Sequence, residues 1–510
     1  MAIARFRPLG VVADIDPANV PENYWTEAIN MVPRPRGMER ARGYQEIYAT
    51  PLFGPTFLMA TPQLGVKYWI YAGFSAVATV DPNGQHVDVT PDDLAAPVER
   101  NGWSGGNLNG IAVINSLENG PFYWFEGIGD QALPLPGQRP NTRYDAIRTF
   151  KYHVIGLGVT DNTGTYPDAI HWSDGADPGQ IPATWVPAAE NEAGDDILAD
   201  ESGAIIDGLA LRDAFYIYKQ DSVYEMTYTG GATVYQTRKV FGSTGVLTRN
   251  CVVRVKGTHV VLGNGDIYRH DGQSTESLVD GKMRDTFFAA IDDANYENSF
   301  AVYLEPREEV WFCVPSTGQE RPDIALVWNV TTNEFGYRAL PQCDFAAAGV
   351  VGEQQSLEVW DDDEMPWNSD LTAWLDQTIN NTEDSVLLAD ADGEKFYLAN
   401  TGVLAAGEPY RASIGKLSIN LGDPEREKSV RRVWPHIEGV RDATYTLELF
   451  NQRDPMAAQE QVIVRDFQPG VHGVAVNINC RYLGMRIYSD TESEWFCSGF
   501  DVDYSEQGRF

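Results

Sequence analysis

Short stretches of alternating apolar and polar residues, paired around glycine-containing turns, are the feature that most constrains the fold of this chain. The segment 259–274, HVVLGNGDIYRHDGQS, places two such stretches on either side of Asn264-Gly265, and the segment 67–90 does the same around Asn83-Gly84. A period of two is typical of β-strands, and Asn-Gly supplies the positive φ angles of a tight hairpin turn. The chain is therefore predicted to consist largely of β-hairpins.

The hairpins recur every few tens of residues, which favours an architecture of repeated small sheets. Further segments carry a polar turn between two apolar arms: 215–231, 299–316, 325–340 and 386–402. In β-propellers and stacked β-repeats, each small sheet buries its faces only against its neighbours. We therefore predict an all-β fold with a β-propeller as its main unit. The repeats have no fixed spacing and no WD or kelch signature, so the number of blades stays open and an assembly of β-sandwiches is the alternative.

The alternating stretches become longer after Gly402, which suggests a second unit. Longer alternating stretches follow, and they begin at Thr444, Glu460, Gly473, Tyr482 and Trp495. We expect residues 1–45 to form an N-terminal extension, residues 46–405 a β-propeller with inserted loops, and residues 406–510 an antiparallel β domain. Helical periodicity is weak and is best in two short segments, 283–295 and 368–379.

An excess of acidic residues limits the partners that this chain can bind. Its 510 residues include 73 Asp and Glu against 38 Lys and Arg, which gives a formal charge of −35 at pH 7. Proteins that grip nucleic-acid phosphates carry the opposite balance, because their affinity comes from cations that displace counterions. The charge balance therefore argues against a phosphate-gripping role.

The cysteines give no sign of a disulfide framework or of a zinc site. They are odd in number, widely spaced and without a CxxC pair: Cys251, Cys313, Cys343, Cys480 and Cys497. This usage is typical of a reducing compartment. Since no apolar run approaches the length of a membrane span and the first residues lack the apolar core of a signal peptide, we expect neither a membrane span nor export.

Two motifs resemble catalytic or sugar-related signatures, and both fit turns better. GWSGG at residues 102–106 matches GxSxG, but the strand pattern NLNGIAVIN follows it, whereas a nucleophile elbow at Ser104 needs a helix there. The segment 170–185, IHWSDGADPGQIPATW, resembles the Asp-box turn of sialidase-type propellers, which is itself structural. A glycosidase also needs two carboxylates held about 5 to 10 Å apart in a cleft. The sequence nominates no such pair, so we expect no catalytic residue.

No metal or cofactor site is predicted. DADGE at residues 390–394 contains part of a calcium-loop pattern but lacks the later ligands of the twelve-residue loop, and the seven histidines form no HExxH motif. An acidic run at Asp361, Asp362, Asp363 and Glu364 is most simply a solvated loop. It is also the candidate for a loop that contacts a partner or lines a channel.

Six segments, spread over nearly the whole chain, form an ordered series. The first, residues 14–45, has an Asp-Pro pair, a Trp-centred stretch and an Arg- and Gly-containing stretch that leads to RGY. The others are residues 101–124, 170–185, 259–272, 418–439 and 481–509. Taken in this order, they resemble successive landmarks of the tail nozzle, or tail tubular, proteins of short-tailed bacteriophages.

The resemblance implies a β-propeller whose copies form a homohexameric ring below the portal and adaptor complex, where it continues the DNA channel and docks tail fibres or spikes. It implies a non-enzymatic protein of the virion tail that is made in the bacterial host cytoplasm. An acidic channel wall would expose few cations to the phosphates, so that DNA passes without sequence-specific binding. The alternative that the residues leave open is a carbohydrate-binding or glycoside-cleaving propeller.

Overall fold

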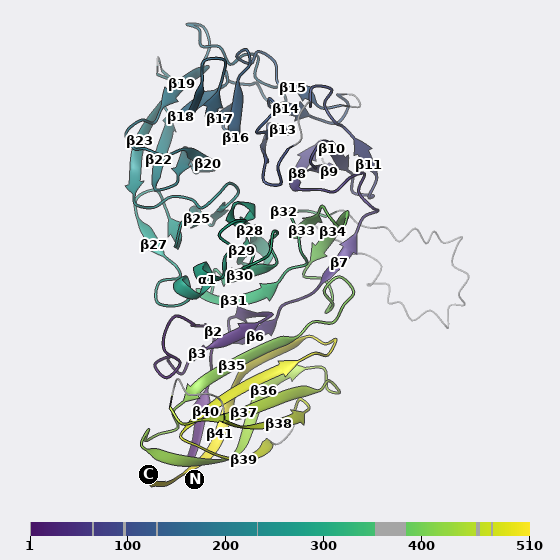
Figure 1. Cartoon of the computed structure of the whole chain (residues 1–510). Helices are drawn as coiled ribbons and strands as arrows, with labels where there is room; N and C mark the ends of the chain where they lie inside the picture. The colour runs from purple at the N-terminus through teal and green to yellow at the C-terminus, as the bar shows by residue number, and fades with distance from the viewer. Residues whose placement is uncertain are drawn as a thin grey trace, which may run out of the picture.

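Small antiparallel sheets arranged around an axis form a β-propeller, and a second β unit lies against one side of it (Figure 1). The computed structural model describes residues 2–63, 66–94, 98–128, 131–231, 233–351, 384–454, 460–470 and 473–509. Within these residues, α-helix is confined to α1 (Arg284–Ala290), inside the predicted segment 283–295. The predicted all-β class, a propeller with an additional C-terminal antiparallel β domain, is confirmed.

Five blades follow one another in the chain, each built from four consecutive strands that pair in chain order. Blade 1 contains β8 (Phe57–Gln63), β9 (Val66–Ala72), β10 (Val77–Val80) and β11 (His86–Asp88). Blade 2 contains β12 (Trp103–Leu108), β13 (Ile111–Ser116), β14 (Phe122–Trp124) and β15 (Leu133–Pro134). Blade 3 contains β16 (Arg143–Phe150), β17 (His153–Thr160), β18 (Thr165–Trp172) and β19 (Gly194–Ile197). Blade 4 contains β20 (Ile205–Leu211), β21 (Ala214–Lys219), β22 (Ser222–Tyr228) and β23 (Tyr235–Gly242). Blade 5 contains β24 (Val252–Val255), β25 (Thr258–Leu262), β26 (Ile267–His270) and β27 (Thr275–Ser277).

The last two blades differ in how they are completed. Blade 6 contains β28 (Phe300–Leu304), β29 (Glu309–Val314), β30 (Ile324–Asn329) and β31 (Glu334–Ala339). Blade 7 contains β32 (Phe345–Gly349), β33 (Ser385–Asp390), β34 (Lys395–Ala399) and, as its outer strand, β7 (Tyr44–Ile47). β7 pairs antiparallel with β34, with Gln45 opposite Leu398. A strand from the other end of the chain thus completes the ring.

The first strand of each blade lies nearest the axis. β8, β12, β16, β20, β24, β28 and β32 contact one another in this order, and β32 contacts β8 again. Because this circle is closed among the described residues, the propeller has seven blades, a number that the sequence left open. Apolar side chains fill the space between neighbouring blades, as Ile155 and Phe215 do between blades 3 and 4.

The predicted Asn-Gly turns lie where the sequence placed them. Gly84 and Gly265 adopt φ angles of 81° and 82°, which only glycine adopts without strain. Oδ1 of Asp81 accepts hydrogen bonds from the backbone N–H groups of Asn83 and Gln85 and so fixes the first of these turns. The two predicted hairpins correspond to β10–β11 and β25–β26.

The second unit is a sandwich of two β-sheets that share one apolar core. One sheet has the strand order β38 (Glu460–Phe467), β37 (Tyr445–Gln452), β40 (Tyr482–Ser489), β35 (Ala412–Ile419) and β4 (Glu27–Ile29). The other contains β39 (Val474–Cys480), β36 (Arg426–Gly439), β41 (Trp495–Arg509), β6 (Gly37–Arg40) and β5 (Met31–Arg34), and β1 (Ala2–Phe6) pairs with β41. Val430, Leu447 and Ile487 pack in the core between them.

Residues 1–45, which the sequence sets apart as an extension, are built into both units. β1, β4, β5 and β6 belong to the sandwich, and β7 begins at Tyr44 in blade 7. A short parallel pair, β2 (Gly10–Val11) and β3 (Tyr24–Trp25), lies between them. Trp25 is fully buried, and its ring centroid lies 5.7 Å from that of Phe500. The N-terminal segment is therefore part of the core and not an appendage.

One continuous sheet joins the propeller to the sandwich. β31 of blade 6 meets β5 where Tyr337 lies opposite Met31, and the β5–β6 hairpin passes the sheet on to β41 (Figure 1). Gly336 permits this contact, because an added Cβ would lie 2.3 Å from the carbonyl oxygen of Met31. The two units are thus connected by backbone pairing as well as by the chain.

Buried ion pairs reinforce this junction. Glu309 of β29 is 1% exposed and pairs with Arg34 of β5 and with Arg307. Glu39 of β6 accepts hydrogen bonds from the same two arginines, from Arg34 at 2.6 Å and from Arg307 at 2.7 Å. Because each carboxylate contacts two guanidinium groups, neither is left as an isolated buried charge.

A chain of buried hydrogen bonds holds blades 4 and 5 together. The hydroxyl of Tyr218 lies 2.7 Å from Nδ1 of His259 and 2.6 Å from Nε2 of His270. Since Nε2–H of His259 donates to the carbonyl of Ala210, its Nδ1 accepts the Tyr218 proton, and Nε2–H of His270 donates to the Tyr218 oxygen. Burial lowers the pKa of His259 to about 3 and that of His270 to about 4. Both imidazoles are therefore neutral in the folded protein.

Lowering the pH from 8 to 5 is expected to destabilise the propeller through these two imidazoles. In the unfolded chain each binds a proton near pH 6.5, whereas in the folded chain His259 and His270 stay neutral until about pH 4 or below. The unfolded state then binds more protons, so the free energy of unfolding falls with pH, by about 2 kcal/mol per imidazole at pH 5. Urea unfolding at each pH measures the change. The double variant His259→Gln/His270→Gln should show a smaller loss, and equal losses in the two proteins would contradict this account.

Candidate functional site

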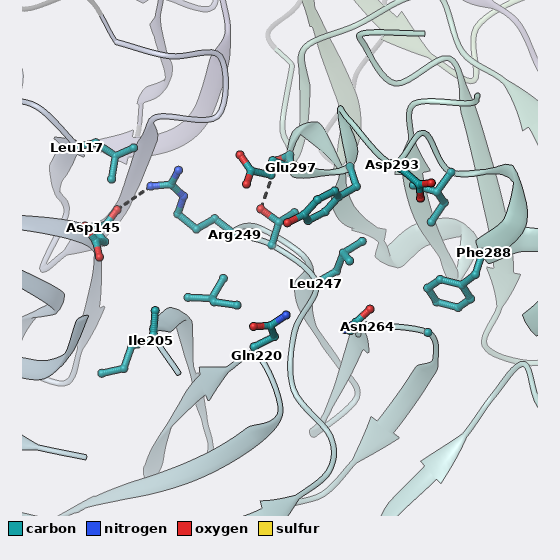
Figure 2. A pocket seen from close by; sticks show the side chains of 16 residues that line it. Leu117, Asp145, Ile205, Gln220, Leu247, Arg249, Asn264, Phe288, Asp293 and Glu297 are labelled. Carbon is teal, nitrogen blue, oxygen red and sulfur yellow. Dashed lines mark hydrogen bonds between the residues drawn. The ribbon is translucent and has the colours of Figure 1, made fainter. Parts of the chain in front are cut away.

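A cavity of about 740 Å³ opens on the face of the propeller where the blade-to-blade linkers and the turns between second and third strands gather (Figure 2). Gln220 and Asn264 line it from turns of blades 4 and 5. Arg249 and Asp293 line it from the linkers that precede β24 and β28. Its volume is typical of pockets that hold a small ligand or the side chains of a partner.

Four charged residues line this cavity, and none of them has an ion-pair partner among the described residues: Asp145, Arg249, Asp293 and Glu297. Asp145 and Arg249 contact each other. Nη1–H of Arg249 donates to the backbone carbonyl of Asp145 at 2.8 Å (Figure 2). Burial lowers the pKa of Arg249 and raises that of Asp145, because each charged form loses contact with water. The remaining guanidinium N–H groups and the carboxylate are therefore open to a ligand that offers both acceptors and donors.

The rest of the cavity combines apolar walls with a polar rim. Ile205, Leu247 and Phe288 supply apolar surface, while the amides of Gln220 and Asn264 stand at the edge (Figure 2). This combination suits a ligand with hydroxyl or amide groups on an apolar frame, such as a carbohydrate or a peptide segment.

A polar network next to the cavity joins the inner strands of several blades. Nη2 of Arg148 in β16 lies 2.8 Å from Oδ2 of Asp207 in β20 and 2.9 Å from Oδ1 of Asn250. Asn250 has a φ of 61°, and its backbone N–H donates to the same Asp207 oxygen. The side-chain amide of Asn250 donates a hydrogen bond to Oδ1 of Asn101, which lies in the linker before β12. The network therefore connects segments of blades 2 to 5 and holds the wall of the cavity in place.

The sequence-predicted partner or channel loop, Asp361, Asp362, Asp363 and Glu364, lies outside the described residues, as does the predicted helical segment 368–379. Its role stays a prediction.

Ser104 of the GxSxG match lies in β12, so this segment is a strand and not the glycine-rich turn that the sequence suggested. Its side chain is buried, and its Oγ accepts a hydrogen bond from the backbone N–H of Ile147 at 3.0 Å. The next element is the antiparallel strand β13. Ser104 thus joins blade 2 to blade 3.

The segment that resembles an Asp-box forms the turn after β18. Oδ1 of Asp174 accepts hydrogen bonds from the backbone N–H groups of Gly175 and Glu192, which ties the two ends of the loop together. Trp185 is fully buried, and its ring stacks on Tyr144 at 5.2 Å. The segment folds as a structural turn, as the sequence predicts.

The acidic turn after β33 is held by arginines. Asp390 lies 2.7 Å from Arg321, and Asp392 lies 3.0 Å from Arg100. In the part of the chain that the structure describes, no group of three His, Cys, Asp or Glu is placed to hold a metal ion. All five cysteines are free and buried. Among the described helices, none has the length and the apolar character that a membrane crossing needs.

Sequence reasoning did not nominate Asp145 or Arg249. Asp145 interrupts an alternating strand pattern at RYDAIRTF, and Arg249 precedes the left-handed Asn250 in a linker. A charge inside an apolar stretch was the only local signal, and it does not reveal that these two residues meet across two blades.

The fold defines the class of protein: a seven-bladed β-propeller with an attached β-sandwich. No protein-family model matches the chain, and no curated protein matches it. Solved structures with a similar fold include the WD40 propeller domain of Doa1, with 9% identity over 70% of this chain and 96% of that chain and a TM-score of 0.35. They also include YCF48 bound to D1 peptide, with 11% identity over 71% and 98% and a TM-score of 0.36. The extracellular domain of BT4673 from B. thetaiotaomicron has 8% identity over 90% and 63% and a TM-score of 0.39. These likenesses carry no argument about what the present chain binds.

Proposed function

We propose that the protein is a structural component of a bacteriophage tail, which forms a ring with further copies of itself and continues the DNA channel below the portal and adaptor. The observation that carries this proposal is the ordered series of six segments, between residues 14 and 509, that resemble tail nozzle proteins. The role is that of a conduit and docking platform, without catalysis.

The architecture supports the proposal in one respect. A ring closes only if every copy is rotated by the same angle relative to the last, which requires a subunit that keeps its shape. The continuous sheet from blade 6 to β41 and the buried pairs of Glu309 restrict bending between propeller and sandwich. The formal charge of −35 fits a wall along which a polyanion moves without being held.

Isolated tails test the proposal directly. We expect the protein in purified tail particles, co-sedimenting with the portal and adaptor, with six copies around the axis when the particles are imaged. Native mass spectrometry of the purified protein should show a closed oligomer. A chain that is absent from tails, or that stays monomeric inside them, would overturn the proposal.

Carbohydrate binding is the second candidate function, and the cavity around Arg249 is the observation that favours it. Asp145 and Arg249 offer an acceptor and donors beside the amides of Gln220 and Asn264, a set that pairs with sugar hydroxyls. We expect binding on a glycan array to be lost in Arg249→Gln, whereas Arg143→Gln, an exposed change on the same strand as Asp145, leaves it intact. An array without signal would exclude this candidate.

A further inference from the structure

One linker between blades forms a wall of the cavity around Arg249. Residues 278–299, between blades 5 and 6, are the longest blade-to-blade linker of the described propeller, and they contain α1. Five of the residues that line the cavity come from this linker: Phe288, Ile291, Asp293, Tyr296 and Glu297. The cavity is therefore built by an added segment as well as by the repeated blades.

Negative charge exceeds positive charge in this cavity. Asp145, Asp293 and Glu297 bring three carboxylates against the one guanidinium group of Arg249, a formal charge of 1 − 3 = −2. No Lys or Arg from elsewhere in the described chain pairs with these carboxylates. The excess is therefore open to a ligand, and it favours one that carries a cationic group.

The carboxylates are spread around the cavity. Figure 2 shows Asp145 and Asp293 on opposite sides, with Glu297 and Arg249 between them. Asp293 and Glu297 are exposed, whereas Asp145 is half-buried. Since water and salt screen a buried charge less, a cation gains most beside Asp145 and is attracted to the cavity by the other two.

Two of the carboxylate residues are held in position by the surrounding chain. An added Cβ at Gly158 would lie 2.3 Å from Oδ2 of Asp145, so this glycine leaves the room that the carboxylate occupies. The backbone carbonyl of Glu297 accepts hydrogen bonds from the side chains of Asn101 and Thr248. A ligand therefore has little of the chain to order when it binds.

The cavity also offers partners for uncharged polar groups. Arg249 makes one side-chain hydrogen bond among the described residues, which leaves guanidinium N–H groups for acceptors. The amides of Gln220 and Asn264 are exposed at the rim and can both donate and accept. Ile205 and Phe288 supply apolar surface. An alkyl amine leaves these donors without acceptors, whereas a sugar ring brings hydroxyl groups to them and an apolar face to the wall.

We propose that this cavity binds an amino sugar, a sugar ring that carries a protonated amine. The ammonium group pairs with the carboxylates, the hydroxyl groups bond to Arg249 and to the amides of Gln220 and Asn264, and the apolar face of the ring lies on Phe288. The inference names the ligand class of the second candidate function, on which it rests, and it does not depend on the tail ring.

Three disaccharides that differ only at C2 test the role of charge. The β-1,4-linked disaccharide of glucosamine carries ammonium groups there, its N-acetylated form carries uncharged amides, and cellobiose carries hydroxyl groups. At about pH 6.5, primary amines of this kind hold their proton. Isothermal titration calorimetry should then give a dissociation constant roughly tenfold lower for the amino form than for either neutral form, and added salt should reduce this preference.

Variants of the protein locate the ammonium group. Asp293→Asn/Glu297→Gln changes two exposed side chains, so thermal unfolding should match that of the wild type, while the affinity for the amino form falls roughly fivefold. Asp145→Asn should weaken it further, because this carboxylate is the least exposed of the three. Asp221→Asn is the matched control: it removes an exposed carboxylate from the same turn as Gln220, but Asp221 does not line the cavity. The control should bind like the wild type.

The outcomes separate this inference from the functions proposed above. Equal affinities for the three disaccharides would overturn the ammonium site and leave a neutral carbohydrate function in place. Spermidine is the amine without a sugar, and binding as tight as that of the amino disaccharide would overturn the sugar frame. A loss in Asp221→Asn as large as in Asp293→Asn/Glu297→Gln would overturn the local site in favour of the general field of an acidic protein. If no disaccharide binds, this inference and the carbohydrate candidate both fall, whereas the tail ring is tested by isolated tails alone.

Discussion

Replacing Arg148 by methionine is expected to lower the free energy of unfolding by about 3 to 5 kcal/mol, because it leaves the buried carboxylate of Asp207 without its cation. The Asp207 side chain is 3% exposed, and Arg148 is its only ion-pair partner among the described residues. Arg148 also donates to Asn250, whose left-handed backbone depends on the same network. Urea unfolding measures the loss.

A charge-matched control is available on the same strand. Arg143 lies in β16 like Arg148, but its pair with Glu118 is exposed, with both side chains about half accessible, so Arg143→Met should cost less than about 1 kcal/mol. The double variant Arg148→Met/Asp207→Asn should recover part of the stability, because it removes both charges. A loss in Arg148→Met no larger than that in Arg143→Met would contradict a structural role for the network.

A chain that lacks residues 2–47 is expected not to fold. This truncation removes the outer strand of blade 7 and four strands of the sandwich together with the buried Trp25. Blade 7 then exposes an unpaired edge at β34, and the sandwich core opens on two sides. Circular dichroism and hydrogen exchange should show loss of cooperative unfolding and of protected amides.

A shorter truncation separates the two effects. A chain that lacks residues 2–43 keeps Tyr44–Ile47, so blade 7 stays closed while the sandwich loses β1, β4, β5 and β6. We expect protected amides in the propeller strands and none in β35–β41. Cooperative unfolding of the longer truncation at wild-type stability would show that β7 is not needed to close the ring.

The parts of the fold that depend on neighbouring residues were predictable from the sequence. The hairpin around Asn264-Gly265 needs only two alternating arms and a residue that tolerates positive φ, and all three lie within sixteen residues. The propeller class follows from the repetition of such units. The number of blades does not, because the spacing between units varies with the length of the linkers.

Pairings between distant segments could not be predicted. An alternating pattern specifies that a strand has one buried face, but it does not specify which strand lies beside it. Tyr44–Ile47 and Ala2–Phe6 therefore gave no sign that they pair with β34 and β41. The same limit applies to the cavity, whose residues Asp145 and Arg249 come from segments of different blades.

The pairing of β1 with β41 has a consequence for the order in which the protein forms on the ribosome. β1, β4 and β7 are synthesised early. The strands that they pair with, β41, β35 and β34 respectively, emerge only much later. The nascent polypeptide therefore carries several lone strands through most of translation, a period in which they are open to association with other chains. Blades 1 to 5, whose partners are adjacent in sequence, can become compact during this time. Blade 7 is completed only after β34 has emerged, and the sandwich only after β41 has emerged. Ribosome-bound intermediates that lack these strands should therefore already resist proteases in the early blades and remain cleavable in the first forty-seven residues.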